Sequence, residues 1–161
     1  MKGVKVVVDK TSTIMKALRM MTQEAVYVGI PSEENAREDD PITNAVIGYI
    51  NENGSEAAGV PPTPHLVPGV ENVAEQCGDI IANAAADAMT GDFAALTKAY
   101  NKCGLIAQAS VRRVITSQEG FDELAESTIE SRKREGFKGT KRLLRSGQYR
   151  NSITYVIRKT E

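Results

Sequence analysis

Five carboxylates stand close together in the segment 31–41, which is also rich in turn-forming residues. Carboxylate oxygens bind Mg²⁺ and Ca²⁺, so a metal-dependent nuclease is one chemistry that such a group could support. The spacing lacks the D-x-[DN]-x-[DN]-G order of a calcium loop and fixes no pair of ions. We therefore interpret 31–41 as an exposed acidic loop whose field attracts a basic partner. Its acidic residues are Glu33, Glu34, Glu38, Asp39 and Asp40.

The single histidine, His65, is the other candidate for catalysis, because histidine is the most frequent general base. No Ser/His/Asp order and no G-x-S-x-G elbow accompanies it, so a structural or partner-contacting histidine is the favoured interpretation. Cys77 and Cys103 form no CxxC pair, which is typical of free core thiols rather than of a zinc site. These residues therefore predict no metal site and no other cofactor.

The segment around His65 is a proline-rich loop, 57–68, which contains four of the six prolines. Proline fixes φ and removes a backbone donor, so this loop is expected to run extended and to lose little conformational entropy on docking. We predict that it contacts a neighbouring protein. The candidate contact residues are Pro61, Pro64, His65 and Leu66.

A basic arm over 117–147 is the most suggestive feature of the sequence. It loses helical periodicity, and the stretch 132–150 has eight basic residues against one acidic residue. Such a segment could neutralise phosphates, lie against an acidic neighbouring subunit, or simply be solvated. The stretch 132–150 has two aromatic residues, Phe137 and Tyr149, which is few for stacking single-stranded bases. The candidate interface residues are Arg132, Lys133, Arg134, Lys141, Arg142 and Arg145.

The formal charge of −1 over 161 residues hides a separation of charge along the chain. Residues 1–100 carry 7 Lys/Arg against 14 Asp/Glu, whereas residues 101–161 carry 13 against 7. A chain with an acidic front and a basic back can pair head to tail, and such a contact closes into a ring when the rotation permits. No apolar run approaches the ~20 residues that cross a bilayer, so we expect no membrane partner and synthesis in the cytoplasm.

The elements that position these residues follow from periodicity. Alternating β-branched residues predict strands over 3–9, 24–30 and 149–158. Apolar residues at helical spacing predict helices over 11–22, with Thr11–Thr13 as its cap, and over 41–53. Two longer helices are predicted over 69–89 and 92–116.

The two long helices are expected to form an antiparallel hairpin about residues 90–92. Cys77 and Cys103 each lie thirteen residues from Thr90, so this register would place them level. We predict one domain over 1–161 with an α+β fold. It consists of a small mixed β-sheet of about three or four strands packed against the long helical hairpin, with extended loops.

Three segments, taken in order, resemble the small neck and tail-completion proteins of tailed bacteriophages. They are residues 26–31 (VYVGIP), residues 44–54 leading into the proline loop 61–70, and residues 143–156, with the turn Ser146-Gly147-Gln148-Tyr149. Residues 124–134 also resemble the linker into the basic arm of that family.

This resemblance implies a virion structural protein, made in the cytoplasm of the host bacterium, that completes the tail or joins it to the head. It implies a mixed α/β fold, a ring of identical subunits, other neck or tail-tube proteins as partners, and no enzymatic activity. In such a ring we expect the arm of one subunit to meet the acidic loop or another acidic surface of its neighbour, and the proline loop to present an edge to the next ring. The alternative is a protein that contacts DNA through residues 132–150.

Overall fold

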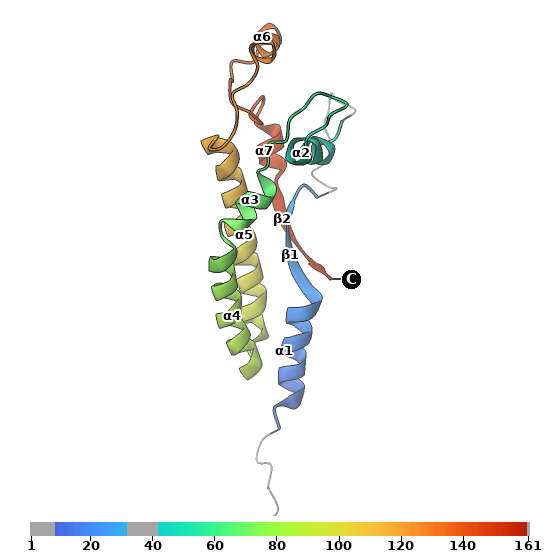
Figure 1. Cartoon of the computed structure of the whole chain (residues 1–161). Helices are drawn as coiled ribbons and strands as arrows, with labels where there is room; N and C mark the ends of the chain where they lie inside the picture. The colour runs from blue at the N-terminus through green and yellow to red at the C-terminus, as the bar shows by residue number, and fades with distance from the viewer. Residues whose placement is uncertain (1–8, 32–41, 161) are drawn as a thin grey trace, which may run out of the picture.

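The computed structural model describes residues 9–31 and 42–160, which form an elongated molecule (Figure 1). Its sequence order mixes helices and strands, in agreement with the expected α+β class. The described helices are α1 (Thr11–Gln23), α2 (Asn44–Asn53), α3 (Leu66–Glu71), α4 (Ala74–Thr90), α5 (Phe93–Ser117), α6 (Glu126–Arg134) and α7 (Gln148–Ser152). The strands are β1 (Glu24–Gly29) and β2 (Thr154–Lys159).

The helical hairpin is confirmed: α4 and α5 pack along each other (Figure 1). Gly91 ends α4 with φ 117°, and its N–H donates to Ala88 O while the N–H of Asp92 donates to Asp87 O. The predicted register is also confirmed. The thiol of Cys77 lies 3.9 Å from Cys103 O, and that of Cys103 lies 3.5 Å from Cys77 O. Burial raises the pKa of Cys103 to about 11.

The sheet of the described residues has two antiparallel strands, with Val26 opposite Ile157 and Val28 opposite Tyr155. These four side chains face inward, toward α1 and α5. Three or four strands were expected, and the predicted strand over 3–9 lies outside the described residues except for Asp9.

The predicted last strand begins too early, because residues 148–152 are helix α7 and β2 starts at Thr154. Gly147, with φ 80°, permits the turn into this helix, and the Ser152 hydroxyl donates to Tyr149 O at 2.7 Å. Tyr149 is buried there by the packing of α7 on α2 and α5. A five-residue helix of this kind has no periodicity to detect.

Two helix starts differ from the sequence prediction. Asp9 Oδ1 accepts the N–H of Thr11 at 2.9 Å, so an aspartate, not the threonines, satisfies the first turn of α1. α2 begins at Asn44 rather than at residue 41, because Thr43 accepts the N–H of Val46 and is its N-cap.

Within 57–68 and the predicted helix 69–89, the boundaries shift. Leu66 to Glu71 form α3, so the proline loop is not extended to its end, and α4 starts only at Ala74. Pro68 is tolerated in α3 because it lies in the first turn, where a backbone N–H has no intrahelical acceptor.

The basic arm is not irregular throughout, since residues 126–134 form α6. Three basic residues lie in its last turn, where they complement the helix dipole. Gln118 ties the arm to the end of α5: its amide donates to Arg142 O at 3.0 Å and accepts the N–H of Arg142 at 2.6 Å.

The approach of the sheet to α5 requires glycine at position 104. A Cβ built on Gly104 would overlap the ring of Tyr155, which lies on the helix at that point. Gly69 has the same function for α3, because a Cβ there would lie 2.6 Å from Val111 Cα on α5. Gly78 on α4 has no atom within 4 Å of its built Cβ.

We expect Gly104→Ala to lower the free energy of unfolding by about 1–3 kcal/mol, because the sheet must move away from α5. Gly78→Ala, on an exposed helix position, is expected to raise it by about 0.5–1 kcal/mol. Urea unfolding followed by circular dichroism measures both. Equal effects of the two variants would contradict the close contact between Tyr155 and α5.

Candidate assembly surfaces

The proline loop is held from the inside by His65. This side chain has no exposed area, so it cannot contact a partner while the loop keeps this arrangement. Its Nδ1 lies 2.7 Å from Thr63 O and 3.1 Å from Glu52 Oε2, both of which are acceptors, so Nδ1 carries the proton. Nε2 then accepts the hydroxyl proton of Tyr149 at 2.5 Å. His65 therefore joins the loop to α7.

Glu52 is the residue of this site that sequence reasoning missed. Its carboxylate accepts the backbone N–H groups of His65, Leu66 and Val67 at 2.8, 2.9 and 3.0 Å. It thereby caps α3, which has no cap from its own N-terminal residue. The cap comes from α2, thirteen or more residues earlier, so no local pattern could have revealed it.

The pKa values of His65 and Glu52 are both lowered in the folded protein. Burial lowers the pKa of His65, although Thr63 O and the Glu52 carboxylate partly offset this effect. Burial raises the pKa of Glu52, but the three N–H donors and His65 lower it more, and the net shift is downward. Both shifts favour the state that holds neutral His65 beside ionised Glu52.

The other predicted contact residues of the loop differ in position. Pro61 and Pro64 are exposed, whereas Leu66 is half-buried against the second core cluster. That cluster contains Val111, Ile115, Tyr149 and Ile153. Of the four contact residues predicted in this loop, Pro61 and Pro64 are therefore the two that are exposed to a partner.

We expect the free energy of unfolding to fall as the pH drops below 6.5. The unfolded chain then binds a proton that the folded chain, with its lowered His65 pKa, does not bind. The slope for one proton is at most about 1.4 kcal/mol per pH unit. Protonation of Glu52 acts in the same direction, but below 4.5.

Urea unfolding between about pH 5 and pH 7.5 measures this slope, and the chain has one histidine, so the window isolates it. His65→Gln is the control, which we expect to abolish the slope in this window while lowering the stability at pH 7.5. A slope that persists in this variant, or a stability that increases in acid, would contradict the assignment.

Much of the basic arm is bound within the protein. Arg142 donates to Asp122 O and to Thr63 Oγ1, at 2.7 and 2.9 Å, and so connects the arm with the proline loop. Arg132 donates to the carbonyls of Gly139 and Lys141.

The remaining predicted cations divide into two groups. Lys141 donates to Thr116 O at 3.1 Å, and Arg145 pairs with Glu135 and lies over the ring of Phe137. Lys133 and Arg134 are exposed, as is Lys138, and none of these three has an ion-pair partner among the described residues. The arm thus presents Lys133, Arg134 and Lys138 to the solvent.

The predicted acidic loop cannot be compared with these cations. Glu33, Glu34, Glu38, Asp39 and Asp40 lie outside the described residues. Elsewhere in the chain, in 9–31 and 42–160, no group of three or more His, Cys, Asp or Glu side chains could hold a metal ion. No helix in these two ranges is both long and apolar enough to cross a bilayer.

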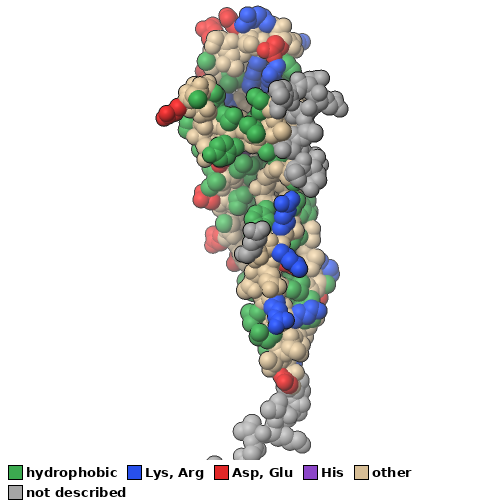
Figure 2. All heavy atoms as spheres, turned by 90° about the vertical axis from the view of Figure 1, so that its right-hand side faces the viewer, with side chains coloured by type: hydrophobic (Ala, Val, Ile, Leu, Met, Phe, Trp, Pro, Cys, Tyr) green, Lys and Arg blue, Asp and Glu red, His purple; other side chains and the backbone are tan. Residues whose placement is uncertain are grey.

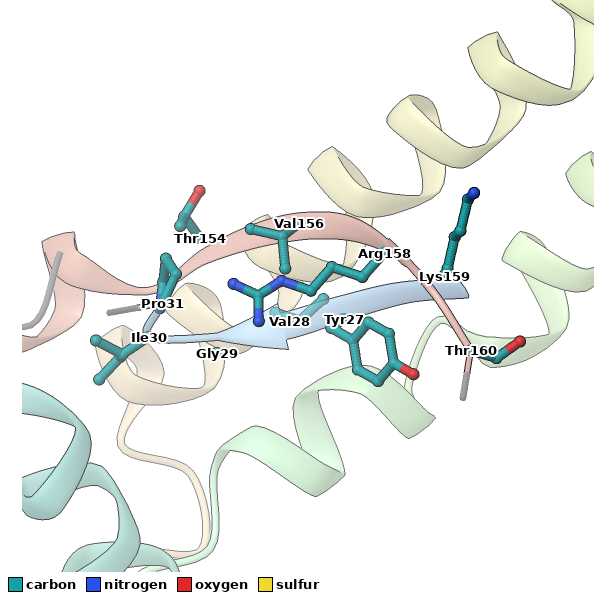
Figure 3. Close-up of a pocket in the computed structure, with 10 residues that line it drawn as sticks. All are labelled: Tyr27, Val28, Gly29, Ile30, Pro31, Thr154, Val156, Arg158, Lys159 and Thr160. Carbon is teal, nitrogen blue, oxygen red and sulfur yellow. The ribbon is translucent and has the colours of Figure 1, made fainter. Parts of the chain in front are cut away.

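The outward face of the sheet is a surface that sequence analysis did not single out. It is hollowed into a pocket of about 700 Å³ lined by both strands and by the residues that follow β1 (Figure 3). Tyr27 of β1 and its cross-strand partner Val156 lie on this face, and the Tyr27 side chain is 48% exposed. Arg158 reaches along it (Figure 3).

This face combines apolar and basic groups. Figure 2 shows Lys and Arg side chains distributed down the side of the molecule that carries α1 and the sheet, with hydrophobic side chains between them. Ile30 and Pro31 extend the apolar part of the pocket beyond the strand. Such a mixture is suited to a protein partner that brings acidic residues around an apolar centre.

A second exposed apolar stripe follows α2. Val46 and Tyr49 are 47% and 71% exposed, which is high for large apolar side chains on one face of a helix. α2 is therefore fixed to the molecule by its other side, where Gly48 lies against Tyr149.

Comparison with known proteins identifies no relative: no family of proteins, no curated protein and no solved structure matches this chain.

Proposed function

We propose that this protein is a structural protein of a tailed-bacteriophage virion, which completes the tail or joins it to the head as a ring of identical subunits. The observation that carries the proposal is the open sheet. One face of β1 and β2 packs on α1 and α5, whereas the face with Tyr27 and Val156 lines a surface pocket in which Tyr27 is 48% exposed. Contact with a further subunit would remove the apolar surface of this face from water.

The phage assignment is supported by how the resembling segments meet. Residues 44–54 form α2 and its cap, residues 61–70 lead into α3, and residues 143–156 include α7. They come together through Glu52 at the start of α3 and through the hydrogen bond from Tyr149 to His65. The second and third resembling segments thus contact each other in one part of the molecule, and the first, residues 26–31, includes the end of β1.

The proposal also states where the protein acts and how its sheet is completed. The subunits are made in the host cytoplasm and act in the virion, with neck or tail-tube proteins as neighbours. The sheet of three or four strands is completed on assembly, with strands added to the two that the described residues form. No catalytic step is part of this function.

Tyr27→Glu is expected to weaken self-association at least tenfold, because it places a carboxylate in the apolar centre of the sheet face. Leu105→Glu is the matched control, since Leu105 is 58% exposed on α5 and does not line that face. Sedimentation velocity over a concentration series measures both. If Tyr27→Glu associates as the unchanged protein does, the sheet face is not a subunit contact.

The charge separation predicts a head-to-tail contact through the arm. Arg132 is bound to backbone carbonyls, so the reversal is best made at the exposed pair, Lys133→Glu with Arg134→Glu. We expect this variant to lose its oligomers at low salt. The control is the double variant Lys98→Glu with Lys102→Glu, which changes the charge equally at two exposed lysines of α5. We expect this control to keep its oligomers. Oligomers of equal size in both variants would exclude the arm as the contact.

Contact with DNA is the second candidate, and the three exposed cations Lys133, Arg134 and Lys138 are the observation in its favour. In that case duplex DNA binds with an affinity that falls as salt rises, with a slope of about −0.9 for each phosphate contact. Reversal of Lys133 and Arg134 then reduces the slope by about two. A fluorescence-anisotropy titration at several salt concentrations measures this. An unchanged slope would contradict DNA contact through α6.

A further inference from the structure

An apolar groove of about 330 Å³ runs beside the sheet, on the side away from β2. One wall consists of α1 and β1 and includes Val26 and Val28. The other consists of the turn between α3 and α4 and the first residues of α4, and includes Val73 and Cys77. α5 forms its floor, and no residue of β2 lines it. The groove therefore lies along the edge of β1 that is opposite its partner strand.

This edge of β1 is a template for another strand. Among the described residues, β1 has β2 as its sole neighbour in the sheet. The backbone N–H and C=O groups of its other edge therefore point over the groove without a strand partner. A strand placed there would complete the ladder and would direct every second side chain down into the groove.

The sequence contains one segment with the pattern that such a site requires. Val4, Val6 and Val8 alternate with Lys5, Val7 and Asp9, so one face of a strand over 3–9 consists of valine alone. Lys2 is on the same face as the valines. Glu24, the single carboxylate among the described residues that line the groove, would attract its ammonium group.

The segment cannot reach this site in its own chain. Asp9 is held at the start of α1 by the N–H of Thr11, and α1 runs straight into β1 (Figure 1). The thirteen residues of α1 separate Asp9 from the start of β1 by about 20 Å. An extended chain covers at most about 3.5 Å per residue, so Val6 lies within about 10 Å of Asp9. Only a second copy can bring it to β1.

We propose that residues 3–9 of one copy bind as an added strand along the free edge of β1 in a neighbouring copy, with Val4, Val6 and Val8 in the apolar groove. This inference rests on the self-association proposed above and specifies one of its contacts. Each copy donates a strand to one neighbour and receives a strand from another, so the contact is head to tail and can close a ring.

Cys77 makes a direct test possible, because its half-buried side chain lines the groove midway between Ala74 and Ile81. The full chain carrying Val6→Cys is oxidised mildly with copper phenanthroline. We expect a disulfide between position 6 of one copy and Cys77 of the next, seen as a ladder of linked subunits on a non-reducing gel. Addition of Cys77→Ser is expected to remove the ladder.

Val7→Cys is the matched control, since position 7 lies on the opposite face of the strand and is expected to give no ladder. A ladder of equal strength from Val7→Cys, a link between position 6 and Cys77 within one chain, or no link to position 6 at all would overturn the inference. A link between Cys77 and Cys103 does not bear on it, because these two residues already lie side by side. Sedimentation of the unoxidised protein separates the two proposals. Oligomers that persist without the link leave the proposed function standing and reject the added strand.

A second pair of variants tests the groove without new thiols. Val70 and Val67 are both exposed on α3, by 39% and 57%, but Val70 alone of the two lines the groove. We expect Val70→Lys to weaken self-association at least tenfold and Val67→Lys to change it less than twofold, as measured by sedimentation. Equal effects of the two variants would contradict docking in the groove.

Discussion

The arrangement depends on small side chains along α5, which allow four elements to pack around one helix. Ala99, Cys103, Gly104 and Ala107 are all buried there, and α3, α4, β1 and β2 contact this helix. The ring of Tyr155 lies directly on Gly104, so the sheet approaches the helix more closely than a larger residue would permit. α5 thereby positions α3, α4 and both strands relative to one another.

The long helices could be predicted from the sequence, because the signals that define them lie within the helices themselves and at their ends. The hairpin of α4 and α5 has a strong apolar period and a glycine at its turn, and these suffice to set even the level of Cys77 and Cys103. The short helices could not be predicted in this way. α3 depends on Glu52 from another helix, and α7 depends on the burial of Tyr149 beside His65.

The candidate surfaces were predictable only in part, for a related reason. The number of cations in the arm can be read from the sequence. Which of them are bound cannot, because Arg132 and Arg142 donate to backbone carbonyls that approach them only in the folded chain. The strand containing Tyr27 was expected, yet which of its faces remains uncovered depends on where α5 lies. Periodicity shows which residues share a face of a strand, but it does not show which other element packs on that face.

The buried side chains fall into two clusters that are held together by different forces. The first, around Ala88, Leu96 and Tyr100, is almost wholly apolar, whereas the second, around Ile115 and Ile153, adjoins the polar chain from Glu52 through His65 to Tyr149. Both clusters nevertheless share one helix, because α5 contributes Leu96 and Tyr100 to the first and Val111 and Ile115 to the second. The hydrogen bonds that join α2, α3 and α7 through Glu52 and His65 lie at the end that bears the basic arm, so acid acts first on this end and leaves the first cluster, which has no such pair, unaffected by the titration of His65.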